Sequence, residues 1–214
     1  MNVEGIRFLN QNVTIINAQS PSEVANLLEM AGRTCYKSES RGNPEEFIKK
    51  LIERGHESVI EHINFTVKFT TNRGVTHELV RHRIASYSQE STRYCNYNGE
   101  MKFIYPVWVN KSFEDWVLEG CETLSSDGEF YASCVEAANR YRSLLSKGWR
   151  PEEAREVLPN ALATDIVVTA NAREWRHIFK LRTSNKSHPQ IRFLMTALLL
   201  SFSTMYPFLF EDLK

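Results

Sequence analysis

The segment Arg81–Tyr94, which reads RHRIASYSQESTRY, constrains the fold more than any other part of this chain. Arginine and hydroxyl side chains dominate it, and its only apolar groups after Ala85 are two tyrosine rings. A segment of this composition does not form core, and it lacks the apolar–polar alternation of a half-buried strand. Its guanidinium and hydroxyl groups are donors that bind phosphate and planar acceptor groups. The sequence therefore predicts a ligand-binding loop here, and a solvated polar loop is the alternative.

The overall charge of the chain is balanced, but its local charge is not. The 214 residues contain 26 Lys and Arg against 26 Asp and Glu, which gives no net field for nucleic acid or a membrane. Between residues 73 and 93, however, four arginines face Glu78 and Glu90. Between residues 171 and 192, six basic residues face Glu174 alone. Two basic stretches in a neutral protein predict separate anionic ligands, with neither a nucleic acid nor a membrane as partner.

Cysteine usage and the N-terminus indicate a cytoplasmic protein. The four cysteines form no CxxC pair, and the first ten residues contain no apolar block typical of a signal peptide. Residues 193–210 carry no charge over eighteen positions, which is near the lower limit for a membrane span. Because several hydroxyl residues and Pro207 interrupt this stretch, we expect a buried C-terminal helix instead.

Periodicity and capping signals predict a single α+β domain over residues 1–214, with a small central sheet flanked by several helices. Strands are expected at 13–17, 64–71 and 163–170 from their apolar alternation or β-branched content. Ser20, Pro21 and Glu23 form a capping-box pattern that opens a helix ending near residue 32. Further helices are expected at 44–55, 75–83, 130–147, 171–182 and 189–205.

The helix expected at 171–182 carries an arginine in line with its apolar side. At about 100° per residue, Trp175, Ile178, Phe179 and Arg182 share one face. The basic residues Arg173, Arg176, His177 and Lys180 fall on the other side. Because an unpaired buried charge is costly, Arg182 either meets an anion or extends to water. A second alternative is that Arg182 points outward and complements the helix dipole.

Metal and nucleophile chemistry have weaker support in the sequence. His77 and His82 are five residues apart, which places them about 140° apart on one helix, so they do not share a metal. We therefore expect no metal site. The cluster GHESVIEH at 55–62 suits either general acid–base chemistry or a hydrogen-bonded junction. Cys95 lies near Arg93, but the sequence positions no base for it.

Several of these residues recur in order and spacing as a known signature. Arg81, His82 and Arg83 are followed, after seven residues, by Ser91, and then by Arg93 and Tyr94. The segment GHESVIEH precedes them, and Asn171, Arg173 and Arg182 follow. In this combination the chain resembles the flavin-dependent thymidylate synthases, the ThyX family, from about residue 55 to residue 190.

The resemblance implies an enzyme of de novo dTMP biosynthesis that reductively methylates dUMP to dTMP. Methylenetetrahydrofolate would donate the one-carbon group, and a tightly bound FAD, reduced by NADPH, would supply the hydride. It also implies a homotetramer with FAD and nucleotide sites at subunit junctions. Two different alternatives are a nucleotide- or RNA-binding regulatory protein and a cysteine-dependent thymidylate synthase with Cys95 as its nucleophile.

Carried over by position, the resemblance also implies two sets of binding residues. The FAD contacts would be Ser58, Arg81, His82, Arg83, Gln89, Asn171, Arg173 and His177. The dUMP contacts would be Glu78, Arg81, Gln89, Glu90, Ser91, Thr92, Arg93, Arg155 and Arg182. Arg182 would be the catalytic residue, facing the uracil ring near N3. A cation there favours the deprotonated N3, by about 1–3 pKa units for such a contact.

Overall fold

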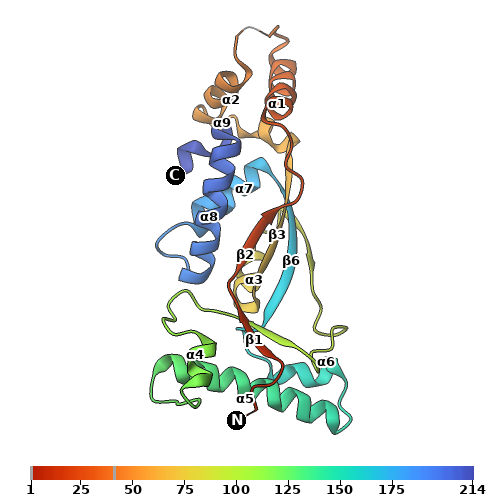
Figure 1. Ribbon diagram of the computed structural model, residues 1–214. Coiled ribbons are helices and arrows are strands. Elements are labelled where there is room, and N and C mark those ends of the chain that lie inside the picture. Colours follow the sequence, from red (N-terminus) through yellow and green to blue (C-terminus); the bar gives the residue numbers. More distant parts are fainter. Residues whose placement is uncertain (1, 41) are drawn as a thin grey trace. The chain divides into compact units, whose positions relative to one another are not determined.

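The computed structural model describes residues 2–40 and 42–214, and the chain divides into two compact units. The first unit comprises residues 1–12, 70–79 and 88–166. The second comprises residues 13–69, 80–87 and 167–214. The α+β class that the sequence predicted is confirmed, because short strands and several helices alternate along the chain (Figure 1). The organisation of residues 1–214 as a single domain stays a prediction.

The strands form two small sheets. Strands β1 (Ile6–Leu9) and β5 (Met101–Ile104) pair in parallel, with Ile6 opposite Met101. The second sheet has the order β2-β3-β6-β4. Its strands are β2 (Asn12–Ile15), β3 (Asn64–Asn72), β4 (Ala85–Gln89) and β6 (Ala163–Asn171).

Helices occupy most of the remaining chain. They are α1 (Pro21–Tyr36), α2 (Pro44–Glu53), α3 (Arg73–Leu79), α4 (Phe113–Leu118), α5 (Ser126–Ser146), α6 (Pro151–Ala154), α7 (Ala172–Arg182), α8 (Pro189–Met205) and α9 (Pro207–Phe210). Short 3-10 segments are η1 (Glu57–His62), η2 (Arg155–Val157) and η3 (Glu211–Leu213). The capping box predicted at Ser20 is present at the start of α1. Among the described residues, no helix is both long enough and apolar enough to cross a membrane.

The core of the first unit is aromatic and forms between the two-stranded sheet and α5. The ring of Phe8 on β1 lies 4.7 Å from that of Phe113 and 4.9 Å from that of Tyr131. Gly128 in the first turn of α5 allows a close approach, since a Cβ there would lie 2.2 Å from the carbonyl oxygen of Glu122. Burial of these aromatic rings stabilises the first unit.

The core of the second unit joins β3 to α7 and α8. Phe65 on β3 lies 5.0 Å from Phe202 on α8, and Trp175 on α7 lies 5.8 Å from Phe179 (ring centroids). Trp175 Nε1 also donates to the carbonyl of Phe65 at 3.1 Å, which satisfies its buried polar atom. Helix α7 packs against η1 and α8, and α8 packs against α9 (Figure 1). The alternation that predicted a strand at 64–71 thus marks the face that meets α8.

The structure corrects the sequence analysis within Arg81–Tyr94. Residues 85–89 form strand β4, although the sequence excluded a half-buried strand there. Half-buried and exposed positions do alternate along β4, but two of the three half-buried side chains, Tyr87 and Gln89, carry polar groups. Gln89 donates to Thr76 Oγ1 at 3.0 Å and to Thr164 Oγ1 at 3.4 Å. An alternation test based on apolar residues fails where hydrogen bonds satisfy the buried side of a strand.

Candidate active site

Helix α7 positions most of the candidate residues in the second unit. It begins at Asn171, whose side-chain oxygen accepts from the backbone N–H of Glu174 at 2.8 Å. This is an ordinary N-cap, so only the amide NH₂ of Asn171 remains to meet a ligand. Buried Trp175 and Phe179 fix the helix on the core, which leaves Arg173 and His177 exposed.

The signature histidine meets the proposed activating arginine. Helix α3 ends at Leu79 rather than at residue 83, so Arg81, His82 and Arg83 lie on the connection from α3 to β4. Arg81 and Arg83 are exposed, whereas His82 is buried. Arg182 Nε donates to His82 Nε2 at 2.9 Å, across 100 residues of sequence. The sequence named both residues as site residues but did not predict this contact.

A buried carboxylate completes a cluster around His82. Glu174 Oε1 lies 3.8 Å from His82 Nδ1, and the ring centroid of His177 lies 6.0 Å from that of His82. Burial, followed by the charge of Arg182, lowers the pKa of His82 to about 4, so the ring is neutral at neutral pH. Burial raises the pKa of the Glu174 carboxyl. Glu174 was not among the predicted site residues, because its partners lie far away in sequence or one turn along the helix.

A cavity of about 510 Å³ opens beside this cluster in the second unit. Its lining includes Asn171, Arg173 and His177, three of the residues expected to bind FAD. Ile84, Glu57, Glu61, Glu174 and Lys180 complete the lining. The volume lies within the range of small-molecule sites, and the walls combine donors, acceptors and an apolar contact.

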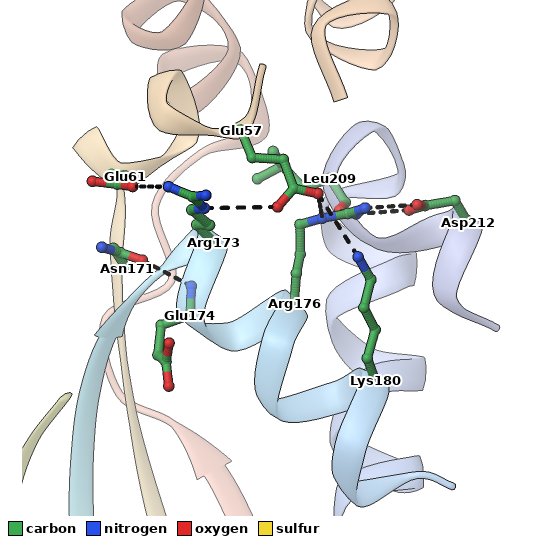
Figure 2. A network of polar contacts seen from close by, with 9 residues as sticks. All are labelled: Glu57, Glu61, Asn171, Arg173, Glu174, Arg176, Lys180, Leu209 and Asp212. Carbon is green, nitrogen blue, oxygen red and sulfur yellow. Dashed lines mark hydrogen bonds and ion pairs between the residues drawn. The ribbon is translucent and has the colours of Figure 1, made fainter. Parts of the chain in front are cut away.

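Acids of the same unit already pair with the cations of this cavity. Arg173 NH1 lies 2.6 Å from Glu61 Oε1, and Lys180 Nζ lies 3.8 Å from Glu57 Oε1 (Figure 2). Ser58, another expected FAD contact, is exposed on η1 between these two glutamates. An anionic group that binds Arg173 or Lys180 must therefore compete with a carboxylate.

Arg176 corrects the predicted helical faces of α7. The sequence analysis placed it on the polar side, but only 1% of its surface is exposed. It forms two hydrogen bonds of 2.7 Å to Asp212, one to the carbonyl of Leu209, and an ion pair of 3.4 Å to Glu57 (Figure 2). Because η1 and α8 both pack against α7, its buried surface is wider than one apolar stripe. Arg176 thus connects α7 to the C-terminal segment.

In the first unit, internal hydrogen bonds engage two of the expected contacts. Gln89 donates to Thr76 and Thr164, as described above. Glu90 Oε1 accepts from the hydroxyl of Tyr97 at 2.7 Å, and the Glu90 carbonyl accepts from Arg73 at 2.9 Å. A ligand contact through the Gln89 amide nitrogen or through Glu90 Oε1 would compete with these partners.

The segment after Glu90 presents hydroxyl and guanidinium groups in a tight turn. The Ser91 carbonyl accepts from the N–H groups of Tyr94 and Cys95 at 3.2 and 2.9 Å. Arg155 NH1 donates to Thr92 Oγ1 at 3.1 Å, so Arg155 from η2 lies beside this turn. Arg93 is exposed, and its Nε lies 3.9 Å from Glu152. Thus Ser91, Thr92, Arg93 and Arg155 do come together, while Glu78 lies half-buried on α3.

The environment of Cys95 does not favour a nucleophile. Burial and the neighbouring Glu90 raise the pKa of this thiol. The protonated thiol is the unreactive form, so the structure argues against Cys95 as an attacking group.

Comparisons with known proteins agree with the signature. Residues 16–208 match the family described as "Thymidylate synthase complementing protein". A protein of Mycobacterium sp. (strain JLS) named "Flavin-dependent thymidylate synthase" is 36% identical over 207 residues, 89% of this chain and 80% of the relative. A relative of the same name from Geobacter sulfurreducens is 36% identical over 86% of this chain and 79% of its own length. Another, from Mycobacteroides abscessus, is 37% identical over 87% of this chain and 78% of its own length. The chain belongs to the flavin-dependent thymidylate synthase family, which confirms the resemblance seen in the sequence.

Proposed function

We propose that this protein is a thymidylate synthase that uses FAD and reductively methylates dUMP to dTMP. Methylenetetrahydrofolate is the one-carbon donor, and NADPH reduces the flavin. Family membership over most of the chain supports this reaction. The structural observation that carries it is the contact between Arg182 and His82, because it joins the signature segment to the arginine assigned to uracil activation.

The cavity of the second unit fits a planar, hydrogen-bonding ring such as that of a flavin. Asn171, Arg173 and His177 offer donors, Glu61 offers an acceptor, and Ile84 offers an apolar surface. We assign these residues, together with Ser58, Arg81, His82 and Arg83, to FAD. Bound there, the flavin supplies the hydride for the reduction. Gln89 joins this set through its side-chain oxygen, because its amide nitrogen already donates to Thr76 and Thr164.

The first unit offers a phosphate site for the nucleotide. Ser91 and Arg93 supply a hydroxyl and a guanidinium, and Arg155 lies within hydrogen-bonding distance of Thr92. Such charge-assisted contacts are the strong ones for phosphate. Glu78, Glu90 and Arg81 complete the proposed dUMP set. Homotetramer assembly, which we propose from the family, allows residues of different protomers to meet one nucleotide.

Arg182 acts on the uracil ring through charge rather than as a base. A guanidinium has only donors and does not lose its proton in proteins. Placed near N3, its charge favours loss of the N3 proton, and the resulting anion makes C5 more nucleophilic toward the methylene carbon. The hydrogen bond to neutral His82 orients Arg182 without cancelling that charge.

The test begins with flavin content. We expect the purified protein to be yellow, to bleach with NADPH under anaerobic conditions, and to form dTMP from dUMP and methylenetetrahydrofolate. A colourless protein that takes up no added FAD and forms no dTMP would refute the proposal. The molar mass measured by light scattering tests the proposed homotetramer. We also propose that the enzyme is cytoplasmic. The balanced net charge argues against the alternative of an RNA-binding protein.

A further inference from the structure

Glu174 is a buried carboxylate for which the sequence predicted no function. It is 8% exposed and lies in the first turn of α7. Its side chain points away from the ion pairs of Arg173 and Arg176 (Figure 2). Instead its Oε1 lies 3.8 Å from His82 Nδ1. Burying a carboxylate costs free energy, so its position beside His82 requires a physical reason.

The hydrogen bond from Arg182 shows which tautomer His82 adopts. Every nitrogen of a guanidinium that carries hydrogen is a donor, so His82 Nε2 must accept with its lone pair. In a neutral ring the proton then resides on Nδ1, the atom that faces Glu174. The separation of 3.8 Å is too long for a direct hydrogen bond, but in a buried setting the carboxylate still attracts the partial positive charge of the Nδ1–H group. Histidines are commonly oriented in this way by a carboxylate on Nδ1.

A metal ion is the competing explanation for this cluster. Ligand atoms of His82, Glu174 and His177 lie within 4.8 Å of one another, and two histidines with a carboxylate are a known zinc set. A metal on His82 Nδ1 would leave the proton on Nε2, where it would oppose the Arg182 donor. A metal on Nε2 would displace Arg182 altogether. Both arrangements also place a dication beside a guanidinium, so the observed contact favours the orienting function.

We propose that Glu174 is a positioning residue for Arg182, acting through His82. The carboxylate holds the Nδ1–H tautomer, the Nε2 lone pair then accepts from Arg182 Nε, and the guanidinium is fixed in one direction. This inference rests on the proposed function, in which Arg182 activates the uracil ring. It assigns Glu174 a function in the turnover step, in addition to its place in the lining of the proposed FAD cavity.

The matched variants are Glu174→Gln, Glu174→Asp and the control Glu46→Gln. Glu174→Gln removes the charge at constant shape, and Glu174→Asp retains it on a shorter side chain. Glu46 is exposed on α2 of the same unit, so its variant makes the same charge change on the surface. We expect Glu174→Gln to lower kcat about 10–100-fold, the usual cost of losing such an orienting partner. The KM for dUMP should change by less than roughly threefold.

Stability separates positioning from a structural role. Because burial raises the pKa of Glu174, its charge costs stability once the pH exceeds that pKa. Glu174→Gln should therefore keep or raise the Tm at neutral pH while kcat falls. We expect Glu174→Asp to recover part of kcat and Glu46→Gln to equal the wild type. In ¹⁵N NMR, His82 of the wild type should show Nδ1 protonated and Nε2 unprotonated, and Glu174→Gln should mix the two tautomers.

Three results would overturn the inference. The first is an unchanged kcat in Glu174→Gln, and the second is a fall in kcat that follows a lower Tm and lost flavin. The third is stoichiometric Zn²⁺ binding by the wild type that Glu174→Gln abolishes. If the wild type itself holds no FAD and forms no dTMP, the proposed function fails, and the assignment of Glu174 fails with it.

Discussion

Replacing Asp212 tests whether the buried arginine of α7 is part of the stability of the second unit. Arg176 is almost fully buried, and Asp212 accepts one hydrogen bond of 2.7 Å from each of its two terminal nitrogens. Asp212→Ala leaves this guanidinium with the Leu209 carbonyl and with Glu57 at 3.4 Å from Nε. Removing one partner of a fully buried ion pair costs about 3–5 kcal/mol. Because the Asp212 side chain is 54% exposed, we expect about 2 kcal/mol instead.

A loss of about 2 kcal/mol corresponds to a fall in Tm of about 4–8 °C for a chain of this length. Thermal unfolding at matched FAD concentration measures it, since bound cofactor also raises Tm. The neighbouring Glu211→Ala is the control, because Glu211 pairs with Lys49 at 3.7 Å at the surface and should cost less than about 0.5 kcal/mol. If both variants shift the Tm equally, the argument from burial is wrong.

The ion pair between Arg176 and Asp212 also predicts how the stability of the protein depends on pH. Hydrogen bonds from Arg176 hold the pKa of Asp212 below its ordinary value of 3.8. A depressed carboxyl pKa contributes stability above the unfolded value, and this stability is lost as the pH falls through the folded pKa. The difference in Tm between wild type and Asp212→Ala should therefore be full at pH 7 and narrow below about pH 4. A constant difference across this range would show that Asp212 acts through packing rather than charge.

Three further predictions concern the candidate site. Arg182→Ala should retain FAD but lower kcat at least about 100-fold and weaken dUMP binding, as turnover and nucleotide titration would show. Cys95→Ala should leave dTMP synthesis within about twofold of the wild type, because the raised pKa of Cys95 keeps the thiol protonated; an inactive variant would revive a cysteine mechanism. Arg173→Ala should raise the Kd for FAD about tenfold, as flavin fluorescence would measure. Its Tm should change little, because Arg173 is exposed and its ion pair with Glu61 lies at the surface.

Local sequence signals predicted the elements that carry the site. The start of α7 at Asn171 follows from the side-chain cap, and β3 follows from the alternation around Phe65, Val67 and Phe69. The cap and the alternation each depend only on residues close together in the chain, so both can be recognised in a single sequence. Strand β4 was missed because its buried side is satisfied by Gln89 hydrogen bonds, which no hydrophobic pattern reveals.

Long-range polar contacts account for the remaining misses. Arg176 can be buried because two acids pair with it: Asp212, which lies 36 residues further along the chain, and Glu57 on η1. The sequence around position 176 indicates neither partner. In the same way, His82 and Arg182 were each named but never paired. A helical wheel ranks side chains by polarity, whereas burial of a charge depends on where its partner lies in space.

The ion pairs also change the meaning of the second basic stretch. Its excess of positive charge suggested an anionic ligand, but Arg173, Arg176 and Lys180 meet Glu61, Asp212 and Glu57 of the same unit. Charges paired in this way offer little long-range field, but each side chain keeps N–H donors for direct contact with a ligand. At its Nε, Arg182 donates to an imidazole that stays neutral. A hydrogen bond to a neutral group fixes direction without cancelling charge, and this combination is what activation of a uracil ring requires.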